Sequence, residues 1–271
     1  MSTENSSKNP TRPTNIKVAK KKKSDILTLA VDCGGNSIKA QALTSTGELL
    51  GEILTTPTTY PLTPHGLLRM IQRFADELPE CDRITVGMPG MIRHGVVIYT
   101  PHYSRKFGPH TEVDAEVEEA WKNFNFAGFL SSHFKKDVLV LNDAEVHAAG
   151  VIHGSGLEVV MTLGTGLGFA IFDNGHLAPH LEMSMAPTRG AKSFDLYIGE
   201  KARRRIGNPM WSRRVLTMVE QLRPVLHWDR LYIGGGNSER ITMTVRQRLG
   251  SDIFIMPNST GVAGGSRAWE I

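Results

Sequence analysis

The chain reads Asp32-Cys33-Gly34-Gly35-Asn36 after its first apolar run, and 132 positions later it reads Gly164-Thr165-Gly166-Leu167-Gly168 after a second one. Apolar and β-branched residues flank both stretches, which is typical of a strand, a glycine turn and another strand. Glycine at such a turn permits a positive φ angle and lets backbone N–H groups approach an anion. Two such turns, each near the start of one half of the chain, predict two similar domains that face one phosphate chain.

The composition of the 271 residues indicates a soluble globular protein of one large domain or two smaller ones. Hydrophobic residues make up 40% and charged residues 21%, which is enough apolar material for a core. No apolar run approaches the roughly 18 to 20 residues that cross a bilayer, so we expect no membrane partner. Cys33 and Cys81 form no CxxC pair or metal cluster, which fits two buried thiols in a reducing cytoplasm.

The net charge of +4 comes from the first 24 residues. That segment holds seven basic residues and one acidic residue, so its charge is +6 and the rest of the chain sums to −2. We expect residues 1–24 to be a disordered basic tail, because they offer almost nothing to bury. The lysine run at 20–23 either binds a polyanion, acts as an address or is simply solvated. The nearly neutral remainder argues against a DNA partner.

The order of predicted elements is strands followed by helices, repeated twice, which indicates an α/β fold with mixed sheets. Residues 100–123 are polar and give no assignment. The expected strands are Ile26–Asp32, Ile38–Thr44, Leu49–Pro57, Arg83–Met88, Val96–Tyr99, Val138–Leu141, two strands within 159–172, Arg230–Ile233 and Ile253–Met256. The expected helices lie at 64–78, 125–134, 143–153, 191–206 and 210–226, with one more before the last strand and a terminal helix from about Gly261.

Three groups in this pattern suit phosphoryl transfer, which needs a phosphate cradle, a metal ion and a group that receives the acceptor's proton. The glycine turns supply the cradle, and Thr165 adds a hydroxyl donor. Lys39 either adds charge or is an exposed strand residue. Asp32 either holds Mg²⁺ through a water molecule or is a simple turn former.

The acceptor base is best sought at Asn142-Asp143, where a strand ends and a helix begins. Asp is also a favoured helix N-cap, which is the alternative interpretation of Asp143. The pair lies at the carboxyl end of a strand, where ligands of α/β sheets bind, and this position favours catalysis.

Five motifs in order resemble those of the ROK sugar kinases of the hexokinase/actin-like superfamily. They lie at residues 32–39, 88–97, 142–144, 163–168 and 233–236, and the similarity covers about residues 26–268. Within that family the chain looks most like the polyphosphate glucokinases. His94-Gly95-Val96-Val97 after Pro89-Gly90 points that way, and so does the missing cysteine-rich zinc motif.

The resemblance implies two actin-like (ribonuclease H-like) domains with a cleft between them, at residues 25–135 and 136–271. The last helix is expected to pack back on the N-terminal domain. The implied activity is transfer of a phosphoryl group from ATP or polyphosphate to the 6-hydroxyl of glucose or a related hexose, with Mg²⁺ and without zinc. The implied partners are a sugar, a nucleotide or polyphosphate, and a second copy in a homodimer. The tail is too short for the DNA-binding domain of the ROK repressors.

The same resemblance assigns roles by position. Asp143 would be the general base, Gly90 and Asn142 would hold sugar hydroxyls, and Glu182 would accept hydrogen bonds from others. The phosphate groups or the nucleotide would lie against residues of both turns and of a third glycine run: Asp32, Gly34, Gly35, Asn36, Lys39, Gly164, Thr165, Gly166, Gly234, Gly235 and Gly236.

The sugar side departs from the family pattern, which reads Glu-x-Gly-His where this chain has Glu182-Met183-Ser184-Met185. Met185 cannot make a histidine's hydrogen bonds, and losing one costs about 1–3 kcal/mol. The loop 100–106 also differs from that of the polyphosphate glucokinases. The alternative is therefore a non-catalytic sugar or nucleotide sensor of the same fold. A group of arginines either guides an acidic polymer or is a solvated helix face: Arg203, Arg204, Arg205, Arg213 and Arg214.

Overall fold

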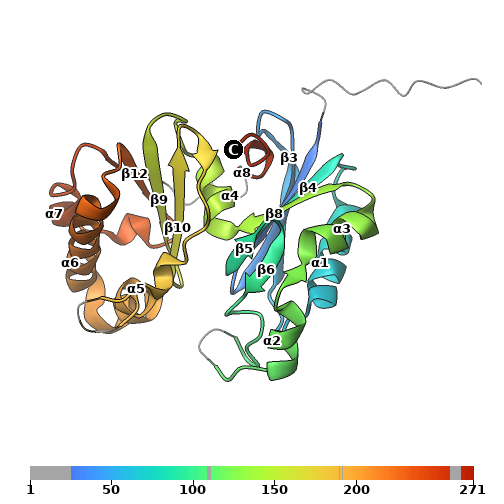
Figure 1. Cartoon of the computed structure of the whole chain (residues 1–271), viewed down its shortest axis with the longest axis horizontal. Helices are drawn as coiled ribbons and strands as arrows, with labels where there is room; N and C mark the ends of the chain where they lie inside the picture. The colour runs from blue at the N-terminus through green and yellow to red at the C-terminus, as the bar shows by residue number, and fades with distance from the viewer. Residues whose placement is uncertain (1–25, 109–110, 189, 191, 257–263) are drawn as a thin grey trace, which may run out of the picture.

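The computed structural model describes residues 26–108, 111–188, 190, 192–256 and 264–271. The expected basic tail and the start of the terminal helix near Gly261 lie outside these residues. Two groups of strands and helices lie side by side in Figure 1, one built from the first half of the chain and one from the second. Within the described part of the chain, no helix is long and apolar enough to cross a membrane.

The first sheet is mixed, as predicted. It consists of β1 (Thr28–Cys33), β2 (Ser37–Leu43), β3 (Leu49–Pro57), β4 (Arg83–Met88) and β8 (Asp137–Asn142), in the order β3-β2-β1-β4-β8. β1 runs antiparallel to β2 and parallel to β4. The first glycine turn therefore joins two neighbouring antiparallel strands.

The second sheet repeats this arrangement. It consists of β9 (Leu157–Leu163), β10 (Leu167–Asp173), β11 (His176–Leu177), β12 (Arg230–Gly234) and β13 (Ile253–Ile255), in the order β11-β10-β9-β12-β13. β9 runs antiparallel to β10 and parallel to β12, so β9 is the counterpart of β1. The repeated topology confirms the predicted α/β fold with mixed sheets flanked by helices.

The expected domain boundary at residue 135 needs a correction. It assigns β8 to the second domain, but β8 pairs in parallel with β4 along its whole length and forms the edge of the first sheet. A parallel strand joins its sheet through a distant partner, so its own residues do not reveal which sheet it enters. We propose a boundary after Asn142 instead.

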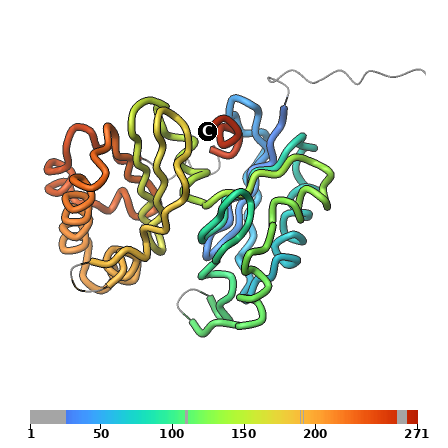
Figure 2. Tube along the Cα trace, viewed as in Figure 1, coloured from blue at the N-terminus to red at the C-terminus, as the bar shows by residue number. Residues whose placement is uncertain are grey.

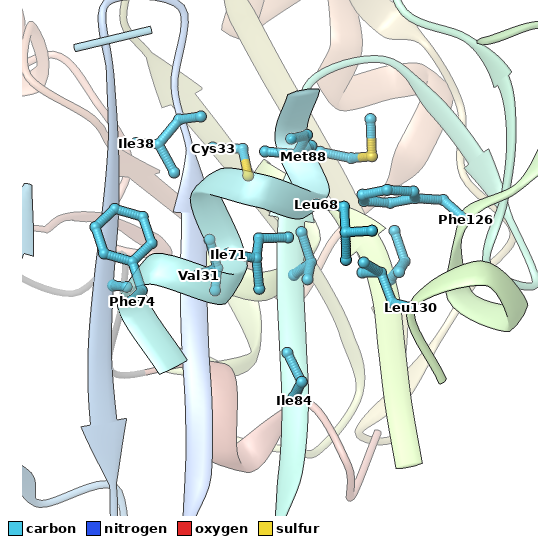
Figure 3. Close-up of a cluster of buried hydrophobic side chains, with 14 of the residues drawn as sticks. Val31, Cys33, Ile38, Leu68, Ile71, Phe74, Ile84, Met88, Phe126 and Leu130 are labelled. Atoms are coloured by element: carbon cyan, nitrogen blue, oxygen red, sulfur yellow. The ribbon is translucent and has the colours of Figure 1, made fainter. Parts of the chain in front are cut away.

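One face of the first sheet is covered by α1 (Pro64–Glu77) and α3 (Phe126–Phe134). Thr63 caps α1 by accepting a hydrogen bond from the Gly66 N–H at 3.0 Å, and Pro64 fits the first helical position. Figure 3 shows the apolar face of α1 pointing at β1, β2 and β4. Burying each large apolar side chain contributes about 1.5–3 kcal/mol, which fixes the strands that carry the first turn. The labelled side chains of this cluster are Val31, Cys33, Ile38, Leu68, Ile71, Phe74, Ile84, Met88, Phe126 and Leu130.

The two halves meet at α4 (Asp143–Ala149) and α8 (Gly264–Arg267). α4 contacts strands of both sheets, namely β4 and β8 of the first and β9 and β10 of the second. α8 packs on α4, β1 and β4, and the Gly265 carbonyl accepts a hydrogen bond from the Thr85 hydroxyl at 2.7 Å. Figure 2 shows the last described residues lying next to the first half of the chain. The last helix thus lies against the first sheet.

The remaining elements include several that the sequence did not indicate. A small sheet is formed by β5 (Met91–Arg93), β6 (Val96–Tyr99) and β7 (Phe124–Asn125), and α2 (Ala115–Trp121) occupies the unassigned stretch. The expected helix at 191–206 starts later, and Gly199 divides it into α5 (Phe194–Ile198) and the beginning of α6 (Glu200–Leu226). α6 also covers the expected helix at 210–226 and is broken at Gly207, where φ is 77°. α4 ends before the expected His153, at Gly150, against which Gly264 of α8 packs closely. α7 (Met243–Arg246) precedes β13, and two short 3-10 helices cover Met183–Met185 and Ser238–Arg240.

Candidate active site

The first glycine turn is held from behind by residues that follow β3. The Gly34 N–H donates to the Ser37 carbonyl at 3.0 Å, and the Thr58 hydroxyl donates to the Gly34 carbonyl at 2.8 Å. The Tyr60 hydroxyl donates to the Gly35 carbonyl. A Cβ at Gly34 would lie 2.8 Å from the Ser37 oxygen, so the turn requires glycine there. These bonds fix the backbone of the turn, including Gly35 and the exposed Asn36 that we expect to face phosphate.

Asp32 and Lys39 lie opposite each other on β1 and β2 at the base of this turn. Burial raises the pKa of the Asp32 carboxyl, and the charge of Lys39 opposes that rise. The Lys39 residue is exposed, so its charge acts at the rim of the turn. A carboxylate whose pKa is raised by burial is stabilised by any cation that approaches it.

The second glycine turn is tied to the third glycine run. The Gly164 N–H donates to the Gly166 carbonyl at 3.0 Å, and Asn237 donates from its side chain to the Gly164 carbonyl at 3.0 Å. The Asn237 backbone N–H also donates to the Leu163 carbonyl at 2.9 Å. Gly235 has a φ of 83°, and a Cβ there would lie 2.6 Å from the Leu163 oxygen. The predicted donor residues Gly164–Gly166 and Gly234–Gly236 are thus neighbours, joined by Asn237, which the sequence analysis missed.

A pocket with three cationic side chains opens beside Thr165. Among the described residues, none of its Lys192, Lys201 and Arg205 side chains forms an ion pair. Of the other arginines in this region, Arg203 and Arg204 pair with Glu200 at 2.8 and 2.5 Å, so they belong to the helix surface. The lining consists of Thr165, Lys192, Asp195, Leu196, Gly199, Lys201, Ala202 and Arg205.

Asn142 rather than Asp143 caps α4. The Asn142 Oδ1 accepts from the Ala144 N–H at 2.8 Å, and Glu145 accepts from the Asn142 N–H at 3.0 Å, which completes a capping box. Asp143 is therefore the first residue of the helix. The N-cap role that was the alternative for Asp143 is therefore filled by Asn142. The Asp143 carboxylate remains available for another role.

Asn142 and Gly90 are bound to each other. The Asn142 Nδ2 donates to the Gly90 carbonyl at 2.9 Å, and the Asn142 residue is only 4% exposed. Gly90 has a φ of 119°, and a Cβ there would lie 2.2 Å from the Tyr99 oxygen, so only glycine fits. Both residues shape the wall beside Asp143, and their direct contact with a sugar stays a prediction.

Asp143 lies among other acidic groups at the centre of this arrangement. Burial, together with the charges of Asp32 and Glu182, raises the pKa of Asp143 to about 7. The Ala144 N–H and His180 partly offset this rise. The second turn reaches the same place, because a Cβ at Gly168 would lie 2.8 Å from the Ala144 Cβ. The structure therefore brings both glycine turns to one carboxylate whose pKa suits proton transfer near neutral pH.

Glu182, whose charge raises the pKa of Asp143, belongs to a second network that no sequence pattern indicated. Its carboxylate accepts a hydrogen bond from Ser184 and lies 3.7 Å from the His180 Nε2. Burial alone would raise the pKa of Glu182, but the nearby His180 and the hydrogen bond from Ser184 hold it below its ordinary value. The network also includes Glu145, which lies 2.9 Å from the His180 Nδ1. The sequence marks Glu145 as the third residue of a capping box, whereas no local pattern marks His180.

The departures on the sugar side have distinct structural outcomes. Met185 is 63% exposed and does not replace a buried hydrogen-bonding group. In the loop 100–106, Arg105 donates to the Pro101 and Thr111 carbonyls at 3.0 and 2.8 Å, so its guanidinium braces the loop itself.

The fit of a magnesium ion rests on Asp32. In the ranges that the structure describes, no three His, Cys, Asp or Glu side chains gather into a metal-binding group. Mg²⁺ needs no such group, because it keeps several waters and is held by one or two carboxylates together with substrate phosphates. The Asp32 carboxylate beside a glycine turn matches that donor set.

The sequence of this chain is related to those of known proteins. The model of the ROK family matches residues 28–179, which is more than half of the chain. The chain belongs to the ROK family. It is 25% identical over 253 residues to a polyphosphate glucokinase of Mycobacterium tuberculosis, covering 88% of this chain and 89% of that relative.

Two solved structures extend the comparison of the fold. An inorganic polyphosphate/ATP-glucomannokinase from Arthrobacter is 25% identical and superposes with a TM-score of 0.73, covering 91% of this chain and 100% of that one. A ROK family glucokinase from Streptomyces griseus, solved with glucose and AMPPNP, is 18% identical with a TM-score of 0.68, over 90% and 98% of the two chains. The latter identity supports the fold alone.

Proposed function

We propose that this protein is a sugar kinase that transfers a phosphoryl group from ATP or polyphosphate to the 6-hydroxyl of glucose or a related hexose. The observation that carries the proposal is Asp143, at the first position of α4, with both glycine turns beside it and a pKa of about 7. The names of the polyphosphate glucokinase and glucomannokinase relatives support the choice of donor and acceptor.

In the proposed reaction Asp143 receives the proton of the primary hydroxyl as the hydroxyl oxygen attacks the terminal phosphorus of the donor. Glu182, whose pKa is held low, accepts hydrogen bonds from other sugar hydroxyls and orients the ring. The bond between the terminal phosphorus and its bridging oxygen breaks, and the shortened donor leaves with that oxygen. The backbone groups of Gly34, Gly35 and Gly164–Gly166 hold the donor phosphates in line with the acceptor.

Asp32 would hold Mg²⁺ through water in this arrangement. When bound, the ion would supply positive charge to the donor phosphates and to Asp32, whose charge raises the pKa of Asp143. The donor chain beyond its reacting end would extend over Thr165 and the third glycine run. The cationic pocket of Lys192, Lys201 and Arg205 favours a polyanionic donor at that end.

The direct test is Asp143→Asn, which keeps the size of the side chain and removes its basicity. We expect turnover to fall about 10²- to 10⁴-fold, because general-base catalysis contributes that much, while hexose affinity stays within about threefold. Asp137→Asn is a matched control, since Asp137 lies exposed at the other end of β8. Unchanged turnover in Asp143→Asn would remove the proposed base.

A second candidate is a non-catalytic sensor of sugar or nucleotide. The exposed Met185, where the family pattern has histidine, is the observation that favours it. A sensor would bind a hexose or nucleotide measurably in calorimetry and phosphorylate none.

We further propose that the protein acts in the cytoplasm as a homodimer without zinc. Two buried free thiols, Cys33 and Cys81, suit a reducing compartment. The dimer follows from the family resemblance, and sedimentation of the full chain tests it. Metal analysis of the purified protein tests the expectation about zinc.

A further inference from the structure

A histidine lies buried between two carboxylates next to the proposed base. The His180 side chain is 3% exposed, and its Nδ1 lies 2.9 Å from the Glu145 Oε1. On the opposite side of the ring, Nε2 lies 3.7 Å from the Glu182 Oε2. Within the described residues this buried Nε2 has no hydrogen-bond partner, although the nearest carboxylate oxygen needs to move by less than 1 Å to become one.

The histidine connects the cap of α4 to the sugar side of the site. Glu145 uses its other oxygen, Oε2, to accept the Asn142 N–H at 3.0 Å. Hydrogen bonds therefore connect the residue before Asp143, through Glu145, to His180, whose other ring nitrogen lies 3.7 Å from Glu182. Glu182 thus lies at the end of this path, and Met185, three residues later, is exposed.

We propose that His180 is a positioning residue that holds Glu182 in the orientation that receives the hydroxyl groups of a hexose; this rests on the proposed sugar-kinase function. A buried N–H donor without a partner costs free energy, so closing the gap to Glu182 is favourable. A hexose that draws the Glu182 carboxylate into place would shorten the 3.7 Å distance to a hydrogen bond.

The charges around the ring suit this role. Burial alone would lower the pKa of His180, but its hydrogen bond to Glu145 and the nearby Glu182 carboxylate raise it to about 9. The groups that face it are those two carboxylates and Asp143, whose pKa its charge lowers. Below pH 9 the imidazolium carries a proton on both nitrogens, so it can donate to both carboxylates once Glu182 closes the gap. Above that pH one N–H is lost, and only one of the two carboxylates keeps its donor.

Two substitutions separate the two sides of the ring. In His180→Asn the amide nitrogen takes the place of Nδ1, so it retains the bond to Glu145 and cannot reach Glu182. In His180→Gln the amide nitrogen reaches toward the place of Nε2 and gives up the bond to Glu145. His176→Gln is the matched control, because His176 lies exposed on β11 in the same segment.

The experiment measures hexose affinity by calorimetry and steady-state kinetics from pH 6 to 10 with the full chain. We expect His180→Asn to weaken glucose affinity and raise its KM about 10- to 100-fold, the range for losing a hydrogen bond to a charged group. Because loss of the His180 charge raises the pKa of Asp143, kcat is compared on the high-pH plateau of each variant's profile, where it should stay within about threefold of the wild type. In the wild type, glucose affinity should fall as the pH rises through about 9, and this fall should be absent in His180→Asn.

The remaining measurements distinguish a role of His180 in positioning Glu182 from a role in the stability of the fold alone. His180→Gln should recover part of the lost affinity even though its melting temperature falls below that of His180→Asn, and His176→Gln should match the wild type throughout. If His180→Asn binds glucose like the wild type and keeps the change near pH 9, the proposal is wrong. If the wild type binds glucose but phosphorylates none, the kinase proposal fails while calorimetry still decides the role of His180. If no hexose binds, both fail.

Discussion

The first and second glycine turns hold equivalent places in the two sheets but carry different side chains. Asp32 pairs with Gly87 across β1 and β4, and Thr162 pairs with Gly234 across β9 and β12 in the same register. At one position the first half has a carboxylate and the second a hydroxyl. We propose that both turns hold donor phosphates, and that the first turn also provides, through Asp32, the negative charge for a cation.

The two turns are also supported differently. The first is fixed by Thr58 and Tyr60, which follow β3 of its own sheet. The second is fixed by Asn237, which follows β12, and by Asp195 of α5, which accepts the Leu167 N–H at 3.2 Å. Changes behind the second turn therefore alter the cationic pocket, whereas changes behind the first turn leave that pocket alone.

Asp32→Asn should show the largest difference in turnover between a change at the first turn and the equivalent change at the second. We expect turnover to fall about 10²- to 10³-fold, because the site loses the carboxylate that would hold the cation on the donor phosphates. Thr162→Ser at the equivalent position should change turnover by less than about threefold. The measurement is kcat with saturating donor over a range of Mg²⁺ concentrations. Equal effects on kcat at both positions would contradict the proposal that Asp32 alone holds the cation.

The pH profile should report Asp143, which lies where the two halves meet. Below a pH of about 7, kcat/KM should fall about tenfold per unit, because the base becomes protonated. The raised pKa means that the folded chain binds this proton more tightly than the unfolded chain. The raised pKa of Asp143 therefore adds its full contribution to the free energy of unfolding below the ordinary value of 3.8. This contribution is lost as the pH rises through about 7. Urea unfolding of the wild type and Asp143→Asn at pH 5 and 8 measures that loss, which the variant should lack.

Two glycines of the second turn should separate stability from donor binding. A Cβ at Gly166 would lie 1.8 Å from the Asp195 Oδ1, so Gly166→Ala should lower the free energy of unfolding by about 1–3 kcal/mol. A Cβ at Gly164 would meet nothing within 4 Å, so Gly164→Ala should change that free energy by less than about 0.5 kcal/mol. We expect Gly164→Ala instead to raise the KM for the donor several-fold and to leave the KM for hexose unchanged. The reverse pattern would contradict the placement of the donor at this turn.

Met185→His should have the smallest effect. Because the side chain is 63% exposed, a histidine there should change the KM for glucose by less than about threefold. A tenfold or larger improvement would mean that the segment after Glu182 rearranges when the sugar binds, and that the support attributed to His180 is shared.

Much of the fold was predictable from the sequence, because apolar strands and glycine turns have strong local signals. β3 and β4 lie where the sequence predicts them, as does the helix that became α1. The membership of β8 in the first sheet was not predictable, because it depends on pairing with β4 some 50 residues away. The division near Gly199 and the early end of α4 also depend on contacts with distant residues, as at Gly264.

For the candidate site, the sequence indicated the turns and Asp143 but not their supports. Asn237 and Asp195 fix the second turn through bonds to backbone groups, which leave no pattern in the chain. His180 gains its place only because β10 and β11 bring the segment after them back onto α4, where Glu145 receives it. The roles given to the glycines, to Asp143 and to Glu182 stay predictions that the variants above test.

The most direct test of the account is a screen of wild-type protein with ATP or polyphosphate, Mg²⁺ and a series of hexoses and amino sugars. Phosphorus and carbon NMR would identify the product. We predict that at least one donor phosphorylates glucose or a related hexose, and that the new phosphate is attached to the 6-oxygen, the primary hydroxyl whose proton Asp143 receives. The absence of any phosphorylated sugar while hexose binding persists, or attachment at another oxygen, would contradict the account.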